Sequence, residues 1–229
     1  MNYYIVIPAH NEEAFIALTL ESLSEQTLLP SKVVVVDDNS TDKTSEIVQE
    51  FASKFSYISL VKKTSEAIHL PGSKVIQAFH KGFETLDNNY DVIVKLDADL
   101  ILPKNYFETI INTYKSDSKI GMAGGFAYIE KNGDWILENL TDKDHIRGAF
   151  KAYRKECFKD LTLYGEMHRL IPSILSWKGF KIVEVKVNHR KRKHGKTKYG
   201  IMRLIKGFLD LLILKFWMQY SARPINLFG

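Results

Sequence analysis

Two pairs of aspartates stand where apolar segments end, and their spacing suits chemistry on a charged ligand. Asp97 and Asp99 follow the apolar segment 92–96, and Asp37-Asp38 ends an earlier apolar segment. Carboxylates one residue apart can reach a divalent cation; hard cations such as Mg²⁺ and Mn²⁺ take oxygen ligands and share their shell with substrate phosphates. Either pair could instead cap a strand or begin a turn. Two acidic strand ends in one chain favour a ligand site, because open α/β sheets bind ligands at this edge.

Alternating strand and helix patterns over the first 119 residues would bring these aspartates together. Apolar strands are predicted at 3–7, 32–36, 57–61 and 92–96. The helix after the first strand places Ile16, Leu20 and Leu23 on one face, and the cluster 39–42 is a helix N-cap signal. Helical spacing after Gly72 predicts a third helix, with Val75 on its apolar face, and Pro103 suits the first turn of the next. Repeated β-α units imply an α/β fold with a mostly parallel sheet and helices on both faces.

The second half of the chain changes pattern. Strands are predicted at 120–130 and 135–138, joined by an Asn-Gly hairpin signal, and again at 148–153 and 181–187. A helix is predicted at 166–177. We therefore expect one domain over residues 1–188 and a C-terminal appendage over residues 189–229.

Composition limits the class of protein. The 229 residues are 45% hydrophobic and 26% charged, as in folded globular proteins. The single cysteine, Cys157, excludes an internal disulfide, suits a reducing compartment and is interpreted as a packing residue. The pattern shows no signal peptide and no uninterrupted apolar run of about 18 residues. We expect the chain in the cytosol or on the cytosolic face of a membrane.

The predicted appendage has an unusual charge distribution. Between Glu184 and Asp210 the chain carries no acidic residue, whereas cations gather in one loop: Arg190, Lys191, Arg192, Lys193, Lys196 and Lys198. The helix predicted next has an apolar side formed by Ile201, Leu204, Ile205, Phe208, Leu212 and Phe216. Flanking cations and aromatic residues favour a helix lying at a membrane surface. The alternative is an amphipathic helix packed on the domain.

The basic loop and the acidic strand ends could serve one ligand, a nucleotide sugar. Its leaving group is a nucleoside diphosphate, so negative charge must be stabilised as it develops. A metal held by Asp97 and Asp99 would do part of this, and Arg192 and Lys198 could fold over the diphosphate. Nucleic acid is the competing partner for a cationic run. We predict no nucleic-acid binding, because the net charge of +5 is modest and an apolar helix follows the loop.

Three motifs in the first hundred residues resemble the family 2 glycosyltransferases of the GT-A fold. They are Val6 to Glu13, Val35 to Asp42, and Asp97-Ala98-Asp99. The resemblance implies a Rossmann-like three-layer sandwich. It also implies that Asp97 and Asp99 serve ribose, diphosphate and metal. The residues implied to line the nucleotide pocket are Pro8, His10, Glu12, Asp38 and Lys74.

The second half resembles a narrower group, the polyprenyl-phosphate glycosyltransferases such as the dolichyl-phosphate mannose synthases. The motifs are 165–169, 187–189 and 192–200, with Arg223-Pro224 near the end. In that group the basic loop clamps donor and lipid phosphates, and the following helices lie at the membrane surface. Ile101 stands where the group usually has a Gln that helps the metal. Many relatives continue into transmembrane helices, so Gly229 predicts either a truncated chain or a peripheral form.

The resemblance implies an inverting transfer of a hexose from a UDP- or GDP-linked donor, with Mg²⁺ or Mn²⁺, to undecaprenyl or dolichyl phosphate. Arg147, Arg154 and Arg169 are candidates for holding the acceptor phosphate, with surface ion pairs as the alternative. Glu166 would be a general base if the acceptor were a sugar hydroxyl; otherwise it is a carboxylate favouring a helix N-terminus. Two other functions stay open. One is a family 2 enzyme extending a saccharide on a glycan, lipid or protein, and the other is a catalytically silent membrane-binding or nucleotide-sensing protein.

Overall fold

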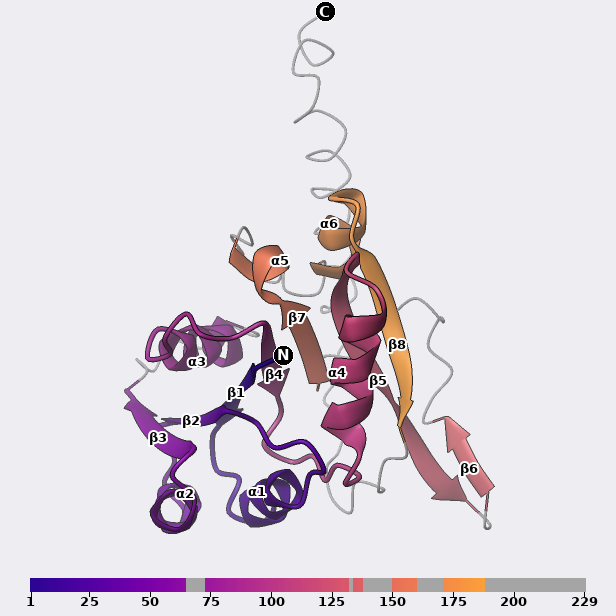
Figure 1. Ribbon diagram of the computed structural model, residues 1–229. Helices are drawn as coiled ribbons and strands as arrows, with labels where there is room; N and C mark the ends of the chain where they lie inside the picture. The colour runs from indigo at the N-terminus through magenta and orange to yellow at the C-terminus, as the bar shows by residue number, and fades with distance from the viewer. Residues whose placement is uncertain (65–72, 132–133, 138–149, 160–170, 188–229) are drawn as a thin grey trace, which may run out of the picture.

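A computed structural model describes residues 1–64, 73–131, 134–137, 150–159 and 171–187 of the chain. All eight strands predicted from the sequence are present and form one sheet (Figure 1). They are β1 (Tyr3–Ala9), β2 (Lys32–Asp38), β3 (Ile58–Lys63), β4 (Val92–Leu96), β5 (Ile120–Lys131), β6 (Asp134–Leu137), β7 (Phe150–Arg154) and β8 (Lys181–Val187). The helices are α1 (Ile16–Ser24), α2 (Thr44–Lys54), α3 (Ser73–Phe83), α4 (Tyr106–Ser116), α5 (Lys155–Lys159) and α6 (Ile171–Trp177).

The strand order is β3-β2-β1-β4-β7-β5-β6, with β8 added beside β5. Strands β1 to β4 pair in parallel, which confirms the prediction for the first half. The second half is mixed, because β7 runs antiparallel to β4 and β5 whereas β8 is parallel to β5. The carboxyl ends of β1, β2 and β4 therefore meet at one edge, where the aspartate pairs lie.

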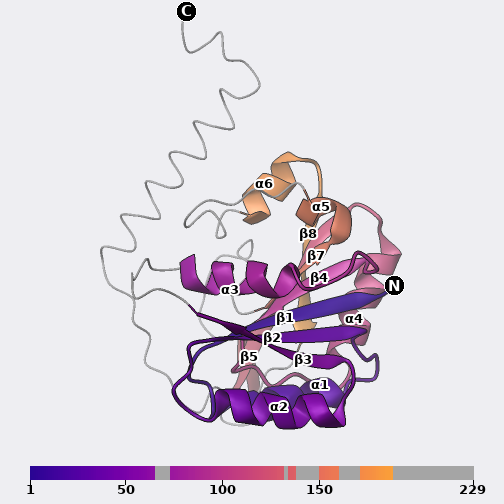
Figure 2. The same ribbon diagram turned by 90° about the vertical axis from the view of Figure 1, so that its left-hand side faces the viewer.

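Helices cover both faces of the sheet, as expected for a three-layer arrangement (Figure 2). Alternate residues of each strand point to opposite faces. On β1, Ile5 and Ile7 pack with α1, α2 and α4, while Tyr4 and Val6 pack with α3, α5 and α6. The three α1 residues predicted to share a face, Ile16, Leu20 and Leu23, are fully buried. The hydrophobic cores thus hold the strand ends in fixed positions.

Several local predictions differ from the structure. Helix α2 begins at Thr44, and Lys43, at the N-cap position, makes no side-chain capping bond. The predicted cluster still serves the helix start, because Asp42 Oδ1 accepts from the Thr44 N–H at 3.0 Å; the cluster also bonds to the loop after β1. Helix α4 begins at Tyr106, three residues after Pro103. Val75 was expected on the apolar face of α3 but is 46% exposed. Helix α5 was not predicted, and residues 166–170 of the helix predicted at 166–177, whose described part is α6, lie outside the described residues.

The predicted appendage, residues 189–229, also lies outside the described residues, as does the turn of the predicted hairpin. Strands β5 and β6 on either side of that turn do pair antiparallel. Among the helices of the described segments, none has the length and apolar content needed to span a membrane.

Gly82 allows α3 to lie close against β1 and β2. A Cβ atom built there would stand 2.6 Å from Cγ2 of Val36 and 2.7 Å from Cγ1 of Val6, both buried side chains. We expect Gly82→Ala to lower the free energy of unfolding by about 1–3 kcal/mol, because overpacking outweighs the better helix propensity of Ala. Urea denaturation measures this. Lys81→Ala, on an exposed side chain of the same helix, is the control. A stabilised Gly82→Ala variant would contradict the close packing.

Asp87 joins the starts of β1 and β2 to the segment after α3. Its carboxylate accepts hydrogen bonds from Lys32 Nζ, Tyr4 Oη and the backbone N–H of Asn89. These bonds, that of Lys32 first, lower the Asp87 pKa from 3.8 to about 2. Because the folded-state pKa is depressed, the stabilisation is present above about pH 4 and is lost as pH falls toward 2.

We therefore expect Asp87→Asn to be less stable than the native chain at pH 7, with the difference shrinking as pH falls below 4. Denaturant unfolding at pH 7, 4 and 3 provides the measurement. A stability difference that stays constant over this range would show that the carboxylate charge is not the cause.

Candidate active site

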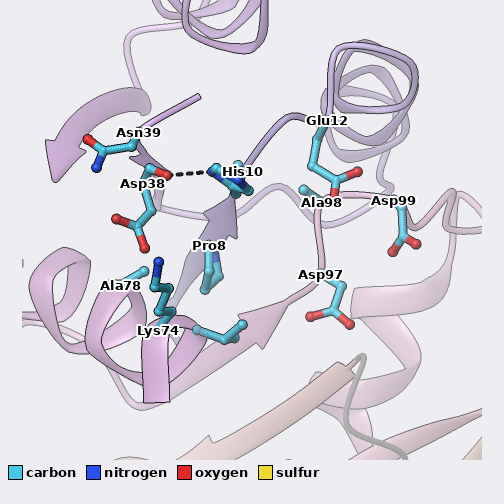
Figure 3. Close-up of a pocket in the computed structure, with 12 residues that line it drawn as sticks. Pro8, His10, Glu12, Asp38, Asn39, Lys74, Ala78, Asp97, Ala98 and Asp99 are labelled. Atoms are coloured by element: carbon cyan, nitrogen blue, oxygen red, sulfur yellow. Dashed lines mark hydrogen bonds between the residues drawn. The ribbon is translucent and has the colours of Figure 1, made fainter. Parts of the chain in front are cut away.

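A cavity of about 380 Å³ opens at the carboxyl ends of β1, β2 and β4, within the size range of small-ligand sites. Seven residues singled out from the sequence line it (Figure 3): Pro8, His10, Glu12, Asp38, Lys74, Asp97 and Asp99. Lys74 reaches in from α3 and points toward Asp38, while Asp97 and Asp99 lie across the cavity from them (Figure 3). The structure therefore brings together residues from four separate segments of the chain.

The loops after β1 and β2 are bonded to each other, which fixes one rim of the cavity. Asn11 Oδ1 accepts from the backbone N–H of Thr41 at 2.8 Å, and the Asn11 N–H donates to Ser40 Oγ at 3.0 Å. Asn11 and Asn39 both have left-handed backbone conformations, with φ of 55° and 58°. Asn tolerates this region better than most residues. The rim is thus set by local backbone geometry before any ligand arrives.

His10 is held by the neighbouring strand end. Its Nδ1 donates to the carbonyl oxygen of Asp38 at 2.6 Å. A carbonyl oxygen can only accept, so the proton of this bond belongs to Nδ1. The imidazole of His10 is exposed, and Nε2 is left as the ring atom available to a ligand.

The two aspartates that end β2 do different things, because consecutive strand residues point to opposite faces. Asp37 is buried and accepts from the Ser40 N–H and the Ser45 hydroxyl, so it orders the loop. Asp38 lines the cavity and pairs with Lys63 at 3.3 Å. Lys63 stands directly beside Asp38 in the register of β2 and β3. Of the two aspartates, only Asp38 is therefore a cavity residue.

Asp97 and Asp99 are the carboxylates best placed for a divalent cation. Both line the cavity, and no group of three or more His, Cys, Asp or Glu side chains in the described segments could hold a metal. Such a donor set fits Mg²⁺ or Mn²⁺ that takes one or two carboxylates and completes its shell with substrate phosphate and water. It does not fit a closed structural zinc site, which needs four protein ligands.

A lysine that contacts Asp97, and a second lysine that faces the first, were missed by the sequence reasoning. Lys95 Nζ contacts Asp97 Oδ1, and Lys151 on β7 lies directly across from Lys95 in the antiparallel register. Lys151 is only 6% exposed. The available signal was Lys95 itself, a cation within an apolar strand, two residues before Asp97 and so on the same face.

Five predicted residues, Arg147, Glu166, Arg169, Arg192 and Lys198, lie outside the described residues. Arg154 is described, and the structure does not support its suggested contact with an acceptor. Its guanidinium donates to the carbonyl oxygens of Ile120, Tyr114 and Asp117 at 2.8–3.2 Å. It therefore satisfies backbone groups at the end of α4 and the start of β5, away from the cavity. Cys157 forms no disulfide and is buried, as a packing residue should be.

Comparison with known sequences decides the family. The sequence model of glycosyl transferase family 2 matches residues 4–171, most of the chain and every residue of the cavity. The chain belongs to glycosyl transferase family 2. Members of this family are glycosyltransferases, and this chain is therefore one as well.

Curated family members similar to this chain include two polyprenyl-phosphate glycosyltransferases. The dodecaprenyl-phosphate galacturonate synthase of Rhizobium johnstonii is 28% identical over 98% of this chain. The undecaprenyl-phosphate 4-deoxy-4-formamido-L-arabinose transferase of Edwardsiella ictaluri is 24% identical over 98% of it. In both cases the match covers 70% of the relative.

A solved structure shows the same fold. The mannosyltransferase PcManGT from Pyrobaculum calidifontis, in complex with GDP-Man and Mn²⁺, superposes with a TM-score of 0.62 at 17% identity. The match covers 85% of this chain and 58% of that one. The GT-A fold expected from the sequence motifs is confirmed.

Asn11 provides a test of what holds the cavity rim formed by the loops after β1 and β2. We expect Asn11→Ala to be about 1 kcal/mol less stable than Asn11→Gly, because Ala loses the bond to Thr41 and is also strained at positive φ, whereas Gly loses only the bond. Urea unfolding gives both values. Asn112→Ala, on an exposed position of α4, should change stability little. Equal stability of the Ala and Gly variants would mean that the left-handed conformation is not required.

Proposed function

We propose that this chain transfers a hexose from a UDP- or GDP-linked donor to a polyprenyl phosphate, with inversion at the anomeric carbon. The observation that carries the proposal is the cavity in which Pro8, His10, Asp38, Asp97 and Asp99 meet. The two polyprenyl-phosphate relatives, each matching 98% of the chain, support the acceptor. The GDP-Man and Mn²⁺ of the mannosyltransferase support the donor class and a divalent cation.

The donor would lie with its nucleoside between β1, β2 and α3. Pro8, Ala78 and Val75 give this part of the cavity an apolar wall suited to a base and ribose. Asp38 and the exposed His10 offer polar partners for the ribose, and Lys74 offers a cation. The diphosphate would then point toward Asp97 and Asp99. A divalent cation bound there would stabilise negative charge on the leaving diphosphate.

The acceptor step needs positioning more than proton transfer. An anionic oxygen of the lipid phosphate forms a bond to the anomeric carbon, and the bond to the donor β-phosphate oxygen breaks. The nucleoside diphosphate leaves with that electron pair. Because the nucleophile is already anionic, holding it in line is the main task. We assign this to Arg147 and Arg169, and assign Arg192 and Lys198 to the diphosphate. Glu166 would act as a base only for a hydroxyl acceptor.

The same proposal places residues 189–229 at the cytoplasmic face of a membrane, as a peripheral appendage to the domain over residues 1–188. The cations at 190–198 and the apolar helical pattern after them support this, since a lipid phosphate must be reached at the interface.

Incubation of the purified chain with labelled UDP- and GDP-sugars and undecaprenyl phosphate tests the proposal. We expect label in the lipid extract. We also expect Asp99→Asn to lower the rate about 100-fold or more, because a carboxylate that would hold the charge-stabilising cation is lost. Glu25→Gln, at a side chain 60% exposed, should leave the rate unchanged.

Label found only in water-soluble or polymeric glycan would replace the lipid acceptor by a saccharide acceptor. A chain that binds nucleotide but turns over no donor, with or without Asp99, would be a sensing or membrane-binding protein. Either result would overturn the proposal.

A further inference from the structure

Lys95 occupies a position that a bound cation would have to share. Its ammonium contacts Oδ1 of Asp97, one of the two carboxylates suited to a divalent ion. The Lys95 side chain is only 16% exposed and that of Asp97 is 32% exposed, so water screens the pair weakly. Lys95 lies in β4 and Asp97 directly follows it, so their spacing of two residues favours side chains on the same side.

Lys151 strengthens the positive side of this cluster. It faces Lys95 directly across the β4–β7 pairing, and like charges in such positions repel. Lys151 is also buried. Because Lys95 faces this second cation, its ion pair with Asp97 is the contact that balances its charge, whatever role Asp97 has toward a ligand.

Charge counting shows the consequence. Asp97 and Asp99 alone carry two negative charges, which would balance a divalent cation without any other group. Asp97, Asp99 and Lys95 together carry a net charge of one negative, and Lys151 on the neighbouring strand makes the balance more positive still. A divalent ion bound alone would then leave an excess of positive charge. A donor diphosphate, with a negative charge on each phosphate, supplies the missing anion.

We propose that Lys95 is a positioning residue that couples divalent-cation binding to nucleotide-diphosphate binding at Asp97 and Asp99. The inference rests on the proposed function, whose donor is a nucleoside diphosphate sugar. Lys95 weakens binding of the cation alone and favours binding of the cation together with the diphosphate. The site is thereby kept from filling with metal before the donor is present.

Mn²⁺ binding, followed by the electron paramagnetic resonance signal of the free ion, tests this without turnover. Titrations are made with Mn²⁺ alone, with UDP and with GDP. We expect Lys95→Met to lower the Kd for Mn²⁺ alone about tenfold and to reduce the enhancement by nucleotide about tenfold, because one positive charge is removed near the carboxylates. Lys95→Arg keeps the charge and should retain most of the enhancement. Lys104→Met, at a side chain 71% exposed, should behave as the native chain.

An unchanged Kd for Mn²⁺ alone in a folded Lys95→Met variant would overturn the inference while leaving the proposed transferase intact. Loss of the enhancement in Lys95→Arg as well would also overturn it, since the shape of lysine rather than its charge would then matter. If the native chain bound no Mn²⁺ with either nucleotide, both the inference and the metal dependence of the proposed function would fail. Thermal unfolding of each variant confirms that it is folded.

Discussion

Strand β1 pairs in parallel with both β2 and β4, and the cavity depends on this double pairing. Parallel neighbours end at the same edge, so the loops after three strands must converge there. The register places Pro8 beside Val36 and Val6 beside Lys95. A shift of one residue in either pairing would turn the site residues toward the opposite helix layer. The buried cores on both faces make such a shift costly, and so the positions of the cavity residues that the strands carry follow from packing.

Much of this arrangement could be predicted from the sequence, because it depends on local patterns. Five-residue apolar segments between helical patterns predicted β1 to β4, and the Asn-Gly hairpin signal with its flanking segments predicted β5 and β6. A polar group directly after such a segment must lie at the carboxyl edge of the sheet, which placed Asp97, Asp99 and Asp38 correctly in the cavity. Pro8, His10 and Lys74 came from the family motifs. Their roles toward a ligand stay predictions, since lining a cavity shows location and not chemistry.

The remaining features depend on which strands become neighbours, and local patterns do not give that. Lys63 meets Asp38 only because β3 joins β2 in one particular register. Lys151 meets Lys95 only because β7, far away in the sequence, runs antiparallel beside β4. Arg154 was misinterpreted for the same reason, since the carbonyl groups that it satisfies come from α4 and β5. Spacing alone did not separate Asp37 from Asp38. The family resemblance singled out Asp38, and in the structure Asp38 lines the cavity while Asp37 bonds the loop.

Both strand ends illustrate how a sheet edge can carry several carboxylates and still fold. Two of the cavity aspartates form ion pairs that balance their charge: Asp38 with Lys63, and Asp97 with Lys95. The two pairs differ in exposure. The side chain of Asp38 is 9% exposed and that of Lys63 15%, whereas that of Asp97 is 32% exposed. Removing one partner of the more buried pair would leave an uncompensated charge, so that pair is best suited to be a fixed part of the rim. Asp97 is the carboxylate that can exchange its lysine for a ligand at lower cost. The edge of the sheet therefore carries one carboxylate, Asp38, that is held in a buried ion pair, and another, Asp97, whose more exposed ion pair can open to bind a ligand.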